Sequence, residues 1–231
     1  MTVGFRVFCQ RKLPSPAVVE SFGALPSANV ADVMNRLNSL PAGTRLQGPR
    51  LARPVAGVAL TVQVAAGDNL LIHKALDMAQ EGDVIVVSNG GAQTQALMGE
   101  VMFGYAKFRK VAAIVFDGPI RDIDSLETLG LPVFATGTRP GGPMKQGPGQ
   151  INVPIAFEGC VVNPGDIVLA DNDGVVIVPR NDAEDVLAKA RALSANDQAK
   201  VAAGRDGTLD RSWVDAALKK AGCEFIEAAH E

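Results

Sequence analysis

Three charged residues in two short segments of the chain could act chemically on a small acid. Glu100 follows Gly99 at the expected start of a helix, and Arg121-Asp122 comes after a twenty-residue gap, in the turn after an expected strand. Carboxylates can bind a hard divalent cation, and a guanidinium can bind a substrate carboxylate through two hydrogen bonds. The backbone N–H groups of Val101 and Met102, left free at the helix start, can donate to an anionic oxygen.

The elements that must position these residues alternate between strand and helix, which is typical of an α/β core. Helices are expected between consecutive strands, and the strands are expected at 55–66, 84–87, 111–116 and 132–135. Ligands of α/β proteins bind outside the carboxyl ends of parallel strands. The turns that follow two neighbouring strands should therefore bring Glu100 and Arg121-Asp122 together at one edge of the sheet.

Local signals also predict the elements on the N-terminal side of this core and the loop that follows it. Two short helices are expected between residues 14 and 40, broken by Pro26, with Ser27 as the N-cap of the second helix. Residues 41–54 are expected to be a loop. Residues 136–150 are rich in glycine and proline and are also expected to be a loop.

A hairpin is expected after that loop, from strands 165–170 and 175–178 joined by Asp171–Gly174. The Asp-Gly pair is a strong hairpin signal, and the turn lacks the glutamate that closes a calcium-binding loop. The helix that begins near residue 100 carries apolar side chains at positions i, i+4 and i+7, namely Val101, Tyr105 and Phe108.

The C-terminal part of the chain is polar with an apolar stripe. One long helix is expected from Ala183 to about Ala203 and a second near Trp213 to Lys220. These helices suggest an external arm with little of its own to pack on, so a neighbouring subunit is a reasonable partner. We therefore divide the chain into an α/β domain at 1–180, including the N-terminal helices, and a C-terminal helical arm at 181–231.

Composition excludes several classes of function. The net charge of −3 comes without any run of lysine and arginine, which argues against nucleic-acid binding. Apolar runs such as 111–116 fall well short of the ~20 residues of a membrane helix. Cys9, Cys160 and Cys223 are odd in number and far apart, which indicates reduced thiols and a cytoplasmic protein. Two histidines are too few for a histidine-rich zinc site.

Each candidate residue also has an ordinary structural interpretation. Asp122 could be the N-cap of a short helix at 122–129, and Glu100 could only complement a helix dipole. Arg121 could be a surface charge. His73 could be a partly buried histidine with satisfied hydrogen bonds rather than a ligand, and Asp68 could be a turn residue rather than a catalyst. Residue spacing alone does not decide between these interpretations and catalysis.

A longer pattern around the two segments resembles a known family. Gly99-Glu100, the twenty-residue gap and the sequence from Asp117 to Asp122 are similar to 4-hydroxy-4-methyl-2-oxoglutarate aldolases and RraA-like proteins. The similarity extends from residues 67–69 through 130–135 to 164–166 and 170–180. The resemblance implies an α/β fold with an RraA-like swivelling β/β/α core, N-terminal helices and a C-terminal helical arm.

The resemblance also implies roles for the site residues. Asp122 would hold Mg²⁺ or Mn²⁺, and Arg121 would bind the substrate carboxylate and the region of the keto oxygen. The turn from Gly99 to Met102, including Val101, would offer its N–H groups to the substrate. Glu100 stands where the family's aldolases usually have aspartate, and it would hold a metal-bound water. Asp197 of a neighbouring subunit lies near the place of a further acidic residue.

The implied activity is that of a divalent-metal-dependent pyruvate aldolase that cleaves a 4-hydroxy-2-oxo acid, with oxaloacetate decarboxylation as a side activity. The family also implies a homotrimer or homohexamer. An alternative is a non-enzymatic regulator that binds ribonuclease E. A Schiff-base aldolase using Lys107 or Lys145 is a further alternative. Arg139 and Lys145 could steer acidic substrates, or could belong to a solvated loop.

Overall fold

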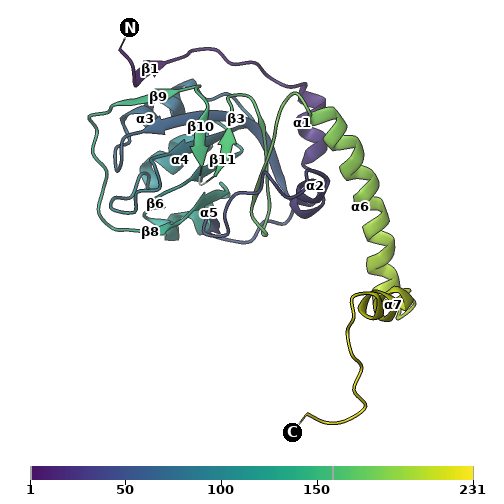
Figure 1. Ribbon diagram of the computed structural model, residues 1–231. Helices are drawn as coiled ribbons and strands as arrows, with labels where there is room; N and C mark the ends of the chain where they lie inside the picture. The colour runs from purple at the N-terminus through teal and green to yellow at the C-terminus, as the bar shows by residue number, and fades with distance from the viewer. Residues whose placement is uncertain (1, 158, 231) are drawn as a thin grey trace. The chain divides into compact units, whose positions relative to one another are not determined.

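The computed structural model describes residues 2–157 and 159–230 (Figure 1), and these form a mixed α/β fold around a large mixed sheet. The described residues contribute nine strands to this sheet. Seven of them follow one another in the order β1 (Phe5–Val7), β9 (Gly149–Ile151), β3 (Val55–Val64), β4 (Asp83–Ser88), β5 (Ala113–Phe116), β7 (Val133–Ala135) and β2 (Arg45–Gln47). The other two are β12 (Ile167–Ala170), which pairs with β3, and β13 (Val175–Val178).

The centre of the sheet is parallel, from β3 through β4 and β5 to β7. These strands are buried on both faces, which explains why they are continuous apolar runs rather than alternating ones. In β4, for example, Ile85 and Val87 enter one hydrophobic core while Val84 and Val86 enter another. The four strands predicted from the sequence are confirmed.

Helices and a small hairpin cover the sheet. One core contains residues of α3 (Leu70–Met78) and α4 (Glu100–Phe108), and α3 contacts both β3 and β9. The other core includes residues of the hairpin of β10 (Ile155–Phe157) and β11 (Cys160–Val162). A third cluster joins β12 and β13 to α1 (Pro16–Phe22), α2 (Ser27–Val33) and the first turns of α6 (Ala183–Arg205). The remaining elements are β6 (Pro119–Ile120), β8 (Gly137–Thr138), a 3₁₀ turn (Ile123–Ser125), α5 (Leu126–Leu129) and α7 (Ser212–Lys220).

Several local expectations were wrong. Ser27 is the first residue of α2 rather than its N-cap, which is Pro26. Its N–H and its hydroxyl both donate to the carboxylate of Asp171, at 2.8 and 2.7 Å. A distant aspartate therefore satisfies the helix start, which no local pattern reveals. The loops predicted at 41–54 and 136–150 contain the short strands β2, β8 and the start of β9.

The apolar pattern expected on α4 is not its buried face. Val101 and Phe108 are largely exposed, whereas Met102, Phe103 and Ala106 are buried. Both sides of this helix carry apolar residues, so periodicity alone could not identify the side that packs. The short helix expected at 122–129 is divided into the 3₁₀ turn and α5. Asp122 lies just before them and has a left-handed backbone conformation.

The chain divides into two compact units, Met1–Ala192 and Leu193–Glu231, and α6 runs from the first into the second. The predicted C-terminal helices are confirmed as α6 and α7. In the second unit, Ser194 is the one buried residue among those the structure describes. No helix in residues 2–157 and 159–230 has the length and apolar character needed to cross a membrane.

Candidate active site

A cavity of about 210 Å³ lies at the carboxyl ends of the parallel strands. It is smaller than the roughly 300–1,000 Å³ of typical ligand pockets, so it suits a small acid. All four segments that follow β3, β4, β5 and β7 contribute to its wall. The lining residues are Asn69, His73, Leu97, Met98, Gly99, Val101, Met102, Arg121, Asp122, Pro143 and Lys145.

Arg121 and Asp122 form the wall after β5, as the strand-end argument predicts. Asp122 has a left-handed backbone (φ 56°, ψ 40°), and its side chain makes no capping hydrogen bond to the helix that follows it. Instead, Asp122 Oδ2 accepts a hydrogen bond from the Glu100 N–H at 3.2 Å and lies 3.6 Å from Arg121 Nε. Both side chains are about half exposed, at 43% for Arg121 and 45% for Asp122. The Asp122 carboxylate therefore caps α4 and remains accessible.

Gly99 allows this close approach of the two segments. A Cβ atom at Gly99 would lie 2.3 Å from Asp122 Oδ2 and 3.0 Å from Arg121 Cγ. The backbone of Gly99 is extended (φ −149°), so its conformation suits any residue. Space, rather than backbone freedom, is therefore what favours glycine at this position, because any larger residue would displace the Asp122 carboxylate.

Among the described residues, one N–H group at the start of α4 has no acceptor. The N–H groups of Met102 and Phe103 both donate to the Gly99 carbonyl at 3.0 Å. The Glu100 N–H is held by Asp122. Within the described residues, no acceptor is recorded for the Val101 N–H. The Glu100 side chain is exposed and is not among the described residues that line the cavity.

Two other carboxylates at the same edge of the sheet are buried and accept hydrogen bonds from the surrounding loops. Asp117 is buried and accepts hydrogen bonds from the Ser88 hydroxyl, from the N–H and side-chain amide of Asn89, and from the Gly91 N–H. Asp68 is also buried and accepts three backbone N–H groups. The turn role considered for Asp68 is confirmed.

The donor set fits a hydrated hard cation. Asp122 is the one carboxylate on the wall of the cavity, and the described part of the chain has no group of three or more His, Cys, Asp or Glu side chains arranged to hold a metal. Mg²⁺ usually keeps several waters and binds one or two carboxylates. Zinc needs three or four protein ligands, commonly nitrogen or sulfur. A single accessible carboxylate therefore suits Mg²⁺ or Mn²⁺.

Three further residues line this cavity: Asn69, which was not considered from the sequence, His73, which was considered as a partly buried histidine, and Lys145, which was considered as a Schiff-base lysine or a steering charge. Asn69 and His73 lie four residues apart at the start of α3, a spacing that could have placed them on one helix face. Burial, together with the positive charge of Lys145, lowers the pKa of His73 below its ordinary value. Lys107, the other lysine considered for a Schiff base, donates to the Gly130 carbonyl at 2.9 Å. It is not among the described residues that line the cavity.

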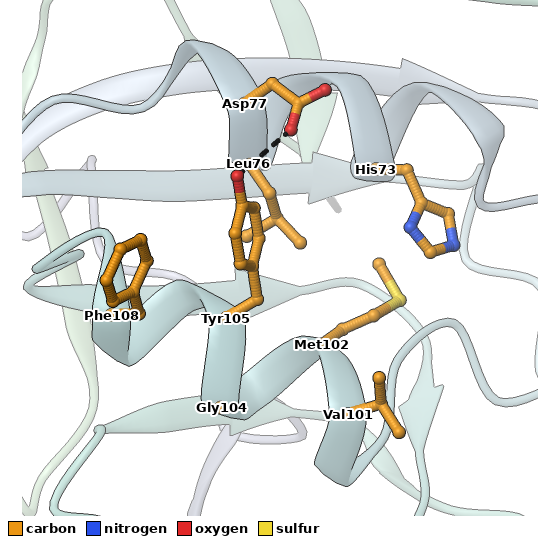
Figure 2. Close-up of a pocket in the computed structure, with 8 residues that line it drawn as sticks. All are labelled: His73, Leu76, Asp77, Val101, Met102, Gly104, Tyr105 and Phe108. Carbon is orange, nitrogen blue, oxygen red and sulfur yellow. Dashed lines mark hydrogen bonds between the residues drawn. The ribbon is translucent and has the colours of Figure 1, made fainter.

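A shallow groove of about 600 Å³ runs between α3 and α4 and shares His73, Val101 and Met102 with the cavity. Figure 2 shows His73 and Met102 pointing toward one another at one end of the groove. Tyr105 donates to Asp77 Oδ1 at 3.3 Å, and Phe108 lies beside Tyr105 (Figure 2). Most of the other side chains along the groove are apolar.

Comparison with known proteins identifies the family. The pattern of RraA-like proteins (Aldolase/RraA) matches residues 27–177. A protein of Halalkalibacterium halodurans, provisionally named 4-hydroxy-4-methyl-2-oxoglutarate aldolase, is 38% identical over 191 residues, which are 83% of this chain and 90% of that protein.

Two solved structures are similar in fold. An uncharacterised protein from Pseudomonas syringae has a TM-score of 0.75 at 27% identity, covering 85% of this chain and 96% of the other. Streptomyces coelicolor RraAS2, described as an unusual member of the RNase ES inhibitor RraA family, has a TM-score of 0.73 at 30% identity, covering 82% and 98%. The chain therefore belongs to the RraA-like family, which includes both aldolases and RNase E inhibitors.

Proposed function

We propose that this protein is a divalent-metal-dependent pyruvate aldolase that cleaves a 4-hydroxy-2-oxo acid such as 4-hydroxy-4-methyl-2-oxoglutarate. The observation that supports this most is the meeting of Arg121, Asp122 and the start of α4 on the wall of one small cavity. A guanidinium, an accessible carboxylate and an open N–H group are the parts needed to bind an oxo acid and stabilise an enolate.

Arg121 is the group proposed to bind the carboxylate next to the ketone. A guanidinium pairs with a carboxylate through two charge-assisted hydrogen bonds, each worth about 1.5–3 kcal/mol. The Val101 N–H, at the positive end of the α4 dipole, can donate to the keto oxygen. Together these two groups would orient the pyruvyl half of the substrate.

The reaction breaks the bond between C3 and C4. The 4-hydroxyl loses its proton and becomes the carbonyl of the departing oxo acid, while the pyruvyl half keeps the electron pair as an enolate and then takes up a proton at C3. The negative charge therefore develops on the oxygen that faces Arg121 and the Val101 N–H in this arrangement. Donors already in place at that oxygen stabilise the transition state more than the substrate. Decarboxylation of oxaloacetate passes through the same enolate and is expected as a side activity.

Asp122 is proposed to hold the Mg²⁺ or Mn²⁺ ion. When bound, such an ion acts as a Lewis acid and lowers the pKa of a coordinated water. Within the chain, Asp122 is kept in position by the Glu100 N–H and by Arg121. The Glu100 side chain is proposed to hold a water of the ion. A contribution of Asp197 from a neighbouring subunit, within a homotrimer or homohexamer, stays a prediction.

A coupled assay of pyruvate release tests this function. With 4-hydroxy-4-methyl-2-oxoglutarate and with oxaloacetate, we expect pyruvate release that EDTA abolishes and that added Mg²⁺ or Mn²⁺ restores. Release that persists in EDTA and is blocked by borohydride would instead indicate a Schiff base at a lysine such as Lys145. No release under any condition, combined with measurable binding to ribonuclease E, would favour the regulator.

A further inference from the structure

The guanidinium of Arg121 is held by few polar contacts. The side chain is 43% exposed, and its Nε lies 3.6 Å from Asp122 Oδ2, which is too far for a hydrogen bond. In residues 2–157 and 159–230, Asp122 is the one charged partner recorded for Arg121. A long side chain that is free to move loses rotamer freedom when it binds a ligand, and this loss weakens binding. Any contact that fixes the guanidinium beforehand therefore strengthens the binding of a carboxylate.

The backbone that carries Arg121 is fixed on two sides. The Arg121 N–H donates to the Met98 carbonyl at 3.0 Å, in the segment that leads into α4. The preceding residue, Ile120, lies opposite Thr138 in the pairing of β6 with β8. Its carbonyl accepts the Arg139 N–H at 2.9 Å. The chain that follows β8 therefore starts directly beside Arg121.

Residues 139–144 form a loop that is tied to the rest of the fold along its length. It begins with the hydrogen bond of Arg139 to the segment that carries Arg121. In its middle, the Gly141 carbonyl accepts the Ala96 N–H at 2.8 Å. At its end, the Met144 N–H donates to the Gly67 carbonyl at 2.9 Å, just before α3. The position of this loop is therefore set by three other segments of the chain.

Within this loop, Gly142 lies against the tip of the Arg121 side chain. A Cβ atom at Gly142 would lie 2.9 Å from Arg121 Nη1, 3.6 Å from Cζ and 4.0 Å from Nη2. The backbone of Gly142 therefore approaches the guanidinium more closely than a residue with a side chain could. Its φ is not positive, so the backbone conformation itself does not require glycine. The next residue, Pro143, lines the cavity.

Gly99 limits the other end of the same side chain. A Cβ atom at Gly99 would lie 3.0 Å from Arg121 Cγ and 3.1 Å from Nε. The stem and the tip of Arg121 are thus each bounded by a glycine, from the segment after β4 and from the segment after β7. Both contacts are steric rather than hydrogen-bonded. They restrict the side chain without using its N–H donors, all of which stay available to a ligand.

From this arrangement we infer that Gly142 is a positioning residue for Arg121, which holds the guanidinium in the orientation that receives the substrate carboxylate. The inference rests on the proposed function, in which Arg121 binds the carboxylate next to the ketone. Donors that are already in place bind this carboxylate without a further loss of side-chain freedom. Any side chain at Gly142 would displace the guanidinium and remove this advantage.

Gly142→Ala tests the inference, and Gly141→Ala is its matched control. Both glycines are exposed and neither has a positive φ, but a Cβ atom at Gly141 meets nothing within 4 Å. The atom that a Cβ at Gly142 meets first is the end of a flexible side chain, so both variants should keep the wild-type melting temperature.

Binding and turnover should separate the two variants. Calorimetry with Mg²⁺ and pyruvate should show about tenfold weaker binding by Gly142→Ala and wild-type binding by Gly141→Ala, because a displaced guanidinium fits the carboxylate poorly. The kcat/KM for 4-hydroxy-4-methyl-2-oxoglutarate should fall about tenfold in Gly142→Ala. Most of this change should be in KM, because the carboxylate is bound in the substrate and in the transition state alike. Wild-type binding and kinetics in Gly142→Ala would overturn the inference.

A double-mutant cycle shows whether Gly142 acts through Arg121. Arg121→Gln should itself weaken the binding of pyruvate, and the addition of Gly142→Ala should cause no further loss. The reason is that the guanidinium, which the new methyl group would displace, is already absent. A further tenfold loss in the double variant would show that Gly142→Ala acts on the cavity by another route, and the inference would be overturned.

An NMR measurement on the protein without ligand separates this inference from the aldolase function itself. The Nε–H signal of Arg121 can be identified by its absence in Arg121→Gln. In the wild-type protein its order parameter should exceed ~0.6, the value below which a group is flexible. The signal should shift in Gly142→Ala and stay in place in Gly141→Ala.

The two possible failures are then distinguishable. A flexible Arg121 side chain, or a signal that Gly142→Ala does not shift, would overturn the inference alone if the enzyme still releases pyruvate. A restricted side chain with the expected shift, in a protein that releases no pyruvate under any condition, would overturn the aldolase function alone.

Discussion

Asp117 and Asp122 stand five residues apart in the segment after β5, yet they occupy opposite environments. Asp117 is 2% exposed, and its two oxygens accept four hydrogen bonds from residues 88–91. The side chain of Asp122 is 45% exposed and accepts one hydrogen bond, at 3.2 Å. These four hydrogen bonds leave the Asp117 carboxylate no free lone pair for a ligand, and they hold residues 88–91 in place. The Asp122 carboxylate is positioned by the Glu100 N–H but keeps lone pairs available, as chemistry on a bound acid requires.

The largest expected effect is the loss of activity when the exposed carboxylate, Asp122, is removed. Asp122→Ala removes the one carboxylate of the cavity and should lower kcat/KM for pyruvate release by about 10³-fold or more, equivalent to ~4 kcal/mol. The side chain is half exposed and makes one long hydrogen bond, but alanine is disfavoured in the left-handed backbone conformation of this residue, so the free energy of unfolding should fall by about 1 kcal/mol only. Steady-state kinetics and a melting curve on the same preparation measure both quantities.

Asp124 provides a matched control for that substitution. It is exposed, it lies in the adjacent 3₁₀ turn, and it is not among the described residues that line the cavity. Asp124→Ala should keep wild-type kinetics. If both alanine variants lost activity equally, the effect would come from the turn as a whole and the distinct role of Asp122 would be lost.

Removal of the buried carboxylate, Asp117, should instead lower the stability of the fold. Asp117→Ala leaves several buried donors without an acceptor and should lower the free energy of unfolding by about 3 kcal/mol. Denaturant titration measures this change. A variant as stable as the wild type would show that Asp117 does not hold residues 88–91, and the contrast between the two carboxylates would disappear.

A smaller effect is expected where the two segments touch. Gly99→Ala puts a methyl group 2.3 Å from Asp122 Oδ2, so the carboxylate must move. A displacement of about 1 Å in an active site can cost 10²-fold in rate, and we expect a loss of up to that size in kcat/KM.

Gly104→Ala is the control on the same helix, because a Cβ atom there meets nothing within 4 Å. It should leave kinetics unchanged and stabilise α4 by up to ~1 kcal/mol, since alanine favours helix. Equal kinetic effects of the two substitutions would show that α4, rather than the contact at Gly99, is responsible.

Parts of this picture could be predicted from the sequence because they depend on local patterns. Strands buried on both faces are continuous apolar runs, and the rule for strand ends correctly brought the Glu100 backbone to Asp122. The packing face of α4 was not predictable, because Val101 and Phe103 are both apolar and only the fold decides which is buried. Lys145 was considered from the sequence as a Schiff-base lysine or a steering charge, but its place on the cavity wall was not predictable, because the backbone beside it is held by hydrogen bonds to Asp68, on a distant part of the chain.

The most direct test of the central claim is a titration with Mn²⁺ followed by electron paramagnetic resonance, which reports the free ion. The wild-type protein and Asp124→Ala should each remove one Mn²⁺ per chain from solution, and Asp122→Ala should not. Excess Mg²⁺ should release the bound Mn²⁺. If Asp122→Ala bound Mn²⁺ as well as the wild-type protein does, the ion would have to lie elsewhere, and the proposed role of Asp122 would be contradicted.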